Sequence, residues 1–108
     1  MEHNDLEKFT HEELSYFTNE ELELLPADLM RRLLDRNGPL PPSAVEKLNA
    51  LIEQTNNQID DSDKKITKRI SKSTKTIDLL KLLVFIIYNA PKIAEGFIFI
   101  LESVTQRN

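Results

Sequence analysis

Two histidines and several paired glutamates are the side chains of this chain that could carry out acid–base chemistry. His3 and His11 both lie near the start of the chain, and His11-Glu12-Glu13 lacks the second histidine that would complete a zinc site on one helical face. The sequence has no cysteine, which excludes disulfide bonds, thiolate metal sites and a cysteine nucleophile. Its two glycines are too few for a glycine-rich phosphate loop. The sequence therefore predicts neither an enzyme nor a protein that binds a metal ion or a cofactor.

The paired glutamates have a structural explanation, because they belong to a tandem repeat. Residues 9–14 read FTHEEL, and residues 17–22 read FTNEEL. In each copy a threonine precedes a glutamate by three residues, which is the pattern of a capping box, and a phenylalanine before the threonine can pack on a leucine at the fourth helical position. Negative charge is also favourable at a helix N-terminus. The repeat predicts two short helices, capped by Thr10 and Thr18.

A third short helix and a proline-rich linker follow the repeat. Pro26 suits the first turn of a helix that we expect to span residues 26–35, and the arginines of its last turn precede Asn37 and Gly38. Residues 38–42, GPLPP, cannot lie inside a helix. With 108 residues the chain has the size of one domain. We expect acidic N-terminal helices in residues 1–37, the linker, and a helical C-terminal part, all within that domain.

The longest periodic segment covers residues 43–88. Ser43 and Glu46 have the spacing of a third capping box, and apolar side chains fall on one stripe of an α-helix along the whole segment. The first interpretation is one long amphipathic helix that associates with a second copy of the chain, because the stripe is longer than short helices can cover. The alternative is a helix pair with a break near residue 60, where asparagines and aspartates favour a turn. The residues predicted for self-association are Ile52, Ile59, Ile66 and Ile70.

The last third of the chain holds most of its strongly apolar residues. It predicts a pair of helices, residues 77–88 and 91–104, because Pro91 disfavours the helical conformation of the residue before it. Ile98 and Phe99 lie off the apolar stripe of the second helix and are predicted to contact a partner. The pair is either the core of a helical bundle or a segment that enters a membrane. Charged and polar residues interrupt the run of about 20 apolar residues that a single span needs.

The net charge of −4 hides a strong asymmetry between the two ends of the chain. Residues 1–63 contain 15 acidic and 5 basic residues, whereas residues 64–108 contain 3 acidic and 9 basic residues. On a helix the basic run would form a cationic face opposite the isoleucines, either solvated or in contact with an anionic partner. We do not expect nucleic acid, because the overall charge is negative and no aromatic side chain lies within the run. The residues predicted to contact a partner or lipid headgroups are Lys64, Lys68, Lys72 and Lys75.

These patterns predict an all-α fold, a small helical bundle in a single domain. The predicted function is that of a non-catalytic interaction or regulatory protein that acts through helix packing, with itself as the expected partner in a homo-oligomer. The alternative is a membrane-attached protein that uses the basic segment 64–75 and the apolar stretch 77–104 at an anionic surface. The acidic, polar N-terminus does not resemble a signal peptide, so we expect the protein in the cytoplasm or at the inner face of a membrane.

Overall fold

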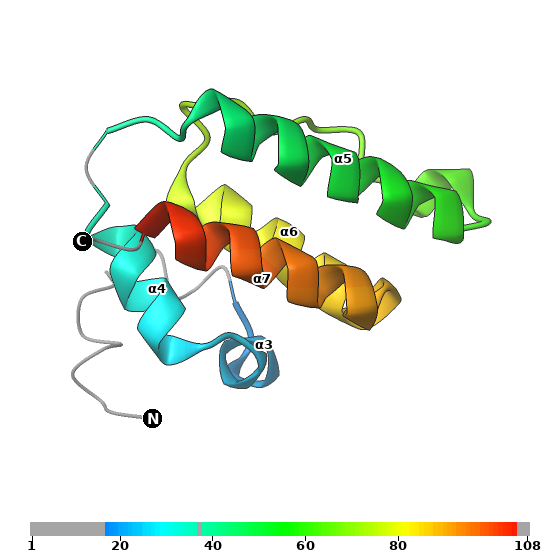
Figure 1. Ribbon diagram of the computed structural model, residues 1–108. Coiled ribbons are helices and arrows are strands. Elements are labelled where there is room, and N and C mark those ends of the chain that lie inside the picture. Colours follow the sequence, from blue (N-terminus) through cyan, green and yellow to red (C-terminus); the bar gives the residue numbers. More distant parts are fainter. Residues whose placement is uncertain (1–16, 37, 106–108) are drawn as a thin grey trace.

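The computed structural model describes residues 17–36 and 38–105, and within these ranges all regular secondary structure is helical (Figure 1). The all-α fold class is confirmed as a compact helical bundle. The elements, labelled as in Figure 1, are α3 (Asn19–Leu24), α4 (Ala27–Leu34), α5 (Pro42–Gln58), the short 3-10 helix η1 (Ser62–Lys64), α6 (Thr76–Asn89) and α7 (Pro91–Thr105).

Helix α3 begins with the capping box that the sequence predicts. The N–H of Glu21 donates to the Thr18 hydroxyl at 3.1 Å, and the N–H of Thr18 donates to the Glu21 carboxylate at 2.8 Å. Phe17, directly before the cap, is buried, and its ring lies 5.3 Å from the ammonium nitrogen of Lys81 on α6. This short helix is thus joined to the rest of the molecule at its first turn. The helix predicted to begin at Thr10 lies outside the described residues.

Helix α4 is close to its predicted bounds and buries one apolar face. Pro26 is its N-cap and Asp35 its C-cap, so the helix starts one residue later and ends one residue earlier than predicted. Asp28 in the first turn forms ion pairs with Arg31 and Arg32. The hydrogen bond from Arg31 and the two positive charges hold the pKa of Asp28 below its ordinary value. Gly38, which follows the helix, has a φ of 91°, a conformation that glycine adopts without strain.

Helix α5 begins differently from the prediction, because the expected Ser43 capping box does not form. Pro41 is the N-cap, no side chain caps the helix, and Pro42 occupies a first-turn position. A proline suits this position because its fixed φ is already helical and its missing N–H would have had no partner inside the helix. Ser43 therefore lies within the helix, where its hydroxyl cannot serve as the N-cap.

The predicted continuous helix over residues 43–88 is wrong, and the alternative with a break near residue 60 is correct. Helix α5 ends at Gln58, η1 is the only helix within residues 59–75, and α6 starts at Thr76. At the break the Asp61 side chain accepts a hydrogen bond from the N–H of Asp63 at 3.0 Å, as turn-forming aspartates do. Ile66 and Ile70 are four residues apart, and residues separated by an even number of positions share one face of an extended chain, so this spacing fits an extended chain as well as a helix.

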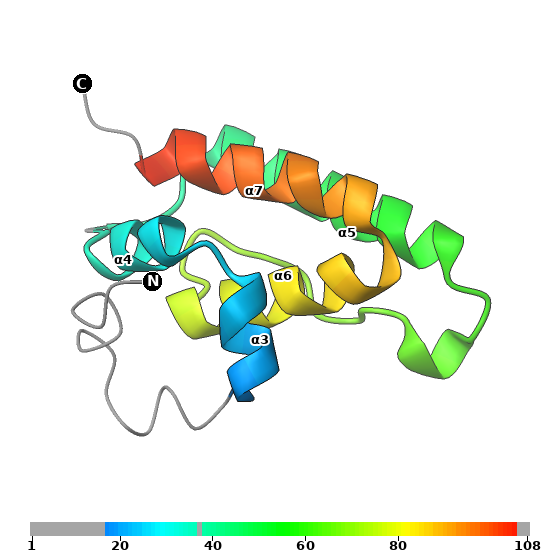
Figure 2. The same cartoon turned by 90° about the horizontal axis from the view of Figure 1, so that it is seen from below.

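The core is built around α7, which packs on α4, α5 and α6 (Figures 1 and 2). The apolar C-terminal stretch thus forms the centre of the bundle. No helix of residues 17–36 and 38–105 combines the length and the apolar character needed to cross a membrane. The largest fully buried side chains are Phe97, Leu29, Met30, Leu33, Leu40, Leu48, Leu79, Leu80, Leu83, Ile86, Leu101 and Thr55.

Candidate functional site

The most distinctive surface feature is a basic extended segment, residues 64–75, which we call the basic strap. It leaves η1, runs back along α5 and reaches the start of α6 (Figures 1 and 2). All six of its basic residues are exposed. Among the described residues the strap forms one ion pair, between Lys68 Nζ and Asp78 Oδ2 at 3.1 Å. The six basic residues are Lys64, Lys65, Lys68, Arg69, Lys72 and Lys75.

Two asparagines of α5 hold the strap by its main chain. Asn49 Nδ2 donates to the carbonyl oxygen of Ile70 at 2.9 Å, and the N–H of Ile70 donates to Asn49 Oδ1 at 2.8 Å. Asn56 forms the same pair of hydrogen bonds with Ile66, at 2.8 and 2.7 Å. Positions 49 and 56 are about two helical turns apart and therefore lie on one face of α5. Each side-chain amide thus replaces a neighbouring strand as the partner of the extended chain.

The C-terminal end of the strap is held by the end of α4 and by the linker. The N–H of Leu40 donates to the carbonyl oxygen of Lys72 at 2.9 Å, and Arg36 Nη2 donates to that of Thr74 at 3.1 Å. The Thr76 hydroxyl donates to the carbonyl oxygen of Leu33 at 3.1 Å. Partial burial lowers the pKa of Arg36 from its ordinary value. Together with the asparagine contacts, these hydrogen bonds fix the position of the strap relative to α4, the linker and α5.

A four-residue repeat in the sequence accounts for the way the strap lies on the helices. Residues 64–67 read KKIT and residues 68–71 read KRIS. Ile70 is buried, Ile66 is partly buried and packs against the core, and Thr67 and Arg69 are exposed. The repeat therefore places an apolar anchor at every fourth position and leaves basic residues at the surface. The same four-residue spacing also fits one face of a helix, so the repeat alone does not distinguish the strap from a helix.

The predicted cationic helix face does not exist, because its lysines do not share a helix. Lys64 ends η1, Lys68 lies in the extended part, and Lys72 lies in a turn closed by a hydrogen bond from the N–H of Thr74 to the carbonyl oxygen of Ser71. Lys75 is the N-cap of α6. The four lysines are nevertheless all exposed on one continuous segment.

The isoleucines predicted for self-association are not brought together on one helical surface. Ile52 lies on α5 and Ile70 on the strap, and both are buried in the core of the same chain. Ile66 is partly buried against that core, and Ile59 is half-buried at the C-cap of α5. The core of a single chain therefore covers most of the apolar surface that the predicted oligomer would use.

Ile59→Asp is expected to change the free energy of unfolding by less than about 1 kcal/mol and to leave the molar mass unchanged. The reason is that Ile59 lies at a helix end and does not belong to the core cluster of the described residues. Urea unfolding and light scattering after size-exclusion chromatography measure the two quantities. Dissociation of an oligomer by this substitution would instead support a self-association stripe.

Helix α7 presents the second predicted contact surface. Phe99 is 70% exposed, whereas Ile98 is half-buried against the core. Phe99 also borders a shallow depression of about 200 Å³ between the start of α5 and the end of α7. This volume is below the roughly 300 Å³ at which small-molecule pockets begin, so the depression is a surface feature rather than a ligand cavity. Its lining residues are Pro41, Ser43, Ala44, Lys47, Phe99, Ile100, Ser103 and Val104.

The described residues, 17–36 and 38–105, contain no candidate metal site. In these ranges no three histidine or acidic side chains are placed to hold a metal ion. His3 and His11 lie outside the described residues. Comparisons of the chain with models of protein families, with curated proteins and with solved structures found no match. The basic strap and the Phe99 surface are therefore the candidate sites, and the strap is the more extensive of the two.

Proposed function

We propose that this chain is a non-catalytic interaction protein whose basic strap binds an acidic segment of a partner protein. The observation that supports this proposal is the charge of the strap, which carries six exposed basic residues within residues 64–75 and a single ion pair among the described residues. Like charges so close together repel one another, and an anionic partner relieves that repulsion. Side-chain and main-chain hydrogen bonds hold the strap in place, so binding orders few additional residues.

A partner protein fits the strap better than nucleic acid or a membrane does. The net charge of −4 opposes a long polyanion, and acidic residues at 60, 61 and 63 directly precede the strap. The strap has no aromatic side chain on which a base could stack. Its isoleucines face the core of the protein and do not extend into solvent, so the strap lacks the apolar side chains that anchor a segment in lipid. An acidic protein segment forms ion pairs with the strap and needs neither stacking side chains nor exposed apolar anchors.

The membrane alternative would also require the bundle to unpack. The apolar residues that would enter the bilayer include Leu83, Ile86 and Phe97, each of which is 0% exposed. Inserting them would remove the contacts that join α6 to α7. The proposed function therefore relies on the folded surface and leaves the core intact.

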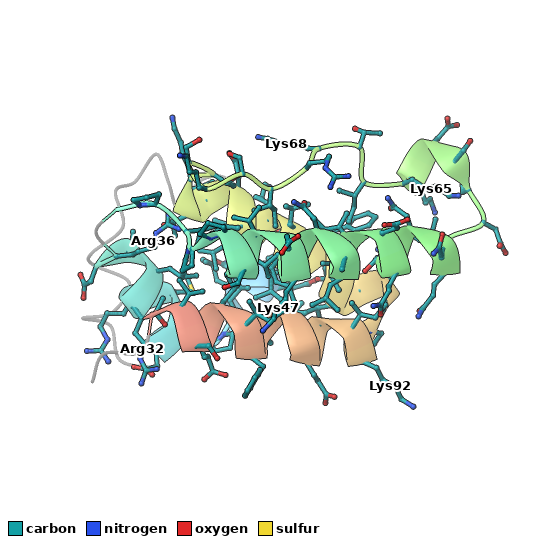
Figure 3. All side chains as sticks on the ribbon, turned by 45° about the horizontal axis from the view of Figure 1, so that its top comes forward. Arg32, Arg36, Lys47, Lys65, Lys68 and Lys92 are labelled. Atoms are coloured by element: carbon teal, nitrogen blue, oxygen red, sulfur yellow. The ribbon has the colours of Figure 1, made fainter. Side chains whose placement is uncertain are left out.

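The proposal predicts that reversing charge on the strap weakens binding, while the same change elsewhere does not. Lys65→Glu with Lys72→Glu should reduce affinity for a glutamate-rich peptide about tenfold or more, because each substitution replaces an attraction with a repulsion. Lys47→Glu with Lys92→Glu, on α5 and α7, changes the net charge equally and should have little effect. Figure 3 shows these control lysines on helices and Lys65 at the start of the strap. Fluorescence anisotropy with the labelled peptide at two salt concentrations measures both variants.

Three outcomes would contradict the proposal. Equal losses in both pairs of variants would show that only net charge matters. Tighter binding to a DNA duplex or to phosphatidylserine vesicles than to the peptide would identify a different anionic partner. Salt-sensitive assembly of the unmodified chain in light scattering, lost in the strap variant, would identify a second copy as the partner.

A further inference from the structure

The two edges of the strap differ in their hydrogen bonding. In an extended chain, the N–H and C=O groups of one residue point to one edge, and those of the next residue point to the opposite edge. Ile66 and Ile70 direct both groups to the asparagines of α5. Thr67 and Arg69 therefore direct theirs to the edge that faces away from α5.

This outer edge is unpaired in the part of the chain that the structure describes. No hydrogen bond between described residues uses the main-chain N–H or C=O of Thr67 or Arg69. Both residues are exposed, and residues 66–71 contain no turn or bend. Figure 3 shows the strap at the margin of the molecule, with α5 on one side and Lys68 projecting away from that helix. Four main-chain groups, two on each of these exposed residues, thus lie at the repeat of a β-strand edge without a hydrogen-bond partner among the described residues.

We propose that the outer edge of the strap pairs with an extended acidic segment, so that the partner adds to it as a β-strand. This inference rests on the proposed function and specifies how the acidic partner binds. Main-chain hydrogen bonds to Thr67 and Arg69 hold the added strand, as in other proteins that bind peptides by strand addition. Acidic side chains opposite Lys68 and Arg69 form cross-strand ion pairs on the two faces of the new ribbon.

The basic residues of the strap also determine which strands can pair with its outer edge. Unpaired strand edges commonly carry lysine, because positive charge prevents identical edges from pairing with each other. Six basic residues on the strap therefore repel the strap of a second copy. An acidic strand is attracted by the same six charges. Charge complementarity therefore gives the edge its specificity, and main-chain hydrogen bonds hold the bound strand.

Thr67→Pro tests the main-chain contact without changing any charge. Proline removes the N–H of residue 67 at the outer edge, and it restricts the preceding residue to the extended conformation that the strap already has. We expect affinity for the glutamate-rich peptide, which has carboxylates on both faces of an extended strand, to fall about tenfold, whereas Thr67→Ala, which keeps the N–H, should bind as the unmodified chain does.

A second measurement leaves the protein unchanged, so it remains informative even if Thr67→Pro does not fold. The same peptide, N-methylated at alternate residues along one edge, keeps its carboxylates and loses the donors of that edge. Two such peptides cover the two edges, and the one methylated on the pairing edge should bind at least about tenfold more weakly than the other.

The outcomes separate this inference from the proposed function. If the peptides bind in a salt-dependent manner but N-methylation and Thr67→Pro have no effect, strand addition is wrong and charge-driven binding stands. If none of the peptides binds and the strap charges make no difference, the proposed function fails together with the inference. If Thr67→Pro and N-methylation of the pairing edge both weaken binding, and Thr67→Ala binds as the unmodified chain does, strand addition is supported.

Discussion

Replacing Asn49 and Asn56 together with alanine is expected to lower the free energy of unfolding by about 4 kcal/mol. Each amide makes two hydrogen bonds with the main chain of the strap, and no other described residue bonds to the N–H groups of Ile66 and Ile70. Without the amides these partly buried groups must find water or remain unpaired, which costs about 1–3 kcal/mol for each truncated partner. A domain of this size has a total stability of roughly 5–15 kcal/mol, so the loss is a large fraction of it.

Asn57→Ala is the matched control for the double substitution. Asn57 lies on the same helix next to Asn56, is exposed, and forms no hydrogen bond through its side chain with a described residue. Its replacement should change stability by less than about 0.5 kcal/mol. Urea unfolding gives the free energies, and amide hydrogen exchange shows whether the N–H groups of Ile66 and Ile70 lose protection first.

The result also bears on the proposed binding surface. If the double variant loses amide protection in the strap while α6 and α7 stay protected, the asparagines hold the strap as a separately stable unit. Binding of an acidic peptide should then weaken, because an unanchored strap loses conformational entropy when it binds. Unchanged stability and protection in the double variant would contradict the role of the two asparagines.

Local signals in the sequence predicted the parts of the fold that depend on local chemistry. The capping box at Thr18 and the break before Pro91 need only neighbouring residues, and both agree with the structure. The Ser43 capping box does not form because α5 starts two residues earlier, with Pro41 as its N-cap and Pro42 in its first turn. Signals of this kind compete over a few residues, so they locate helix ends only to within one or two positions.

The strap could not be predicted in the same way, because distant contacts hold it. Asn49 bonds to a residue 21 positions away and Arg36 to one 38 positions away. Nothing near residues 66–70 indicates that an asparagine on another helix will satisfy their main chain. The isoleucine spacing was compatible with both a helix and an extended segment, and tertiary contacts decided between them.

The residues predicted to make contacts differ in their exposure: the lysines are exposed, and the isoleucines are buried or partly buried. The lysines are exposed although the predicted helix does not form, because the exposure of a charged side chain depends little on secondary structure. Ile52 and Ile70 became core residues, because a break in the long helix gives their apolar surface a partner within the same chain. The polarity of the lysines therefore predicted their exposure, whereas the burial of Ile52 and Ile70 depends on the fold.

The burial of one side of α7 predicts a second large effect on the free energy of unfolding. Phe97→Ala is expected to lower the free energy of unfolding by about 3–5 kcal/mol, since its side chain is 0% exposed and its removal leaves a cavity at the centre of the bundle. Phe99→Ala is the matched control, because residues two apart on a helix point to nearly opposite sides and Phe99 is 70% exposed. Its replacement should stay within about 0.5 kcal/mol of the unmodified chain.

Thermal and urea unfolding of the two phenylalanine variants would test the orientation of α7 directly. The exposed surface of Phe99 makes a further distinction, because its loss should leave binding of an acidic peptide to the strap unchanged. The strap and Phe99 lie on different elements: α5 is hydrogen-bonded to the strap through Asn49, and the first turns of α5 line the depression that Phe99 borders. If Phe99→Ala were the more destabilising change, α7 would have to be rotated about its axis, and the packing of α4, α5 and α6 on it would be assigned wrongly. If Phe99→Ala kept the fold but abolished peptide binding, the partner would occupy the depression beside α5, and the strap would not be the main binding surface.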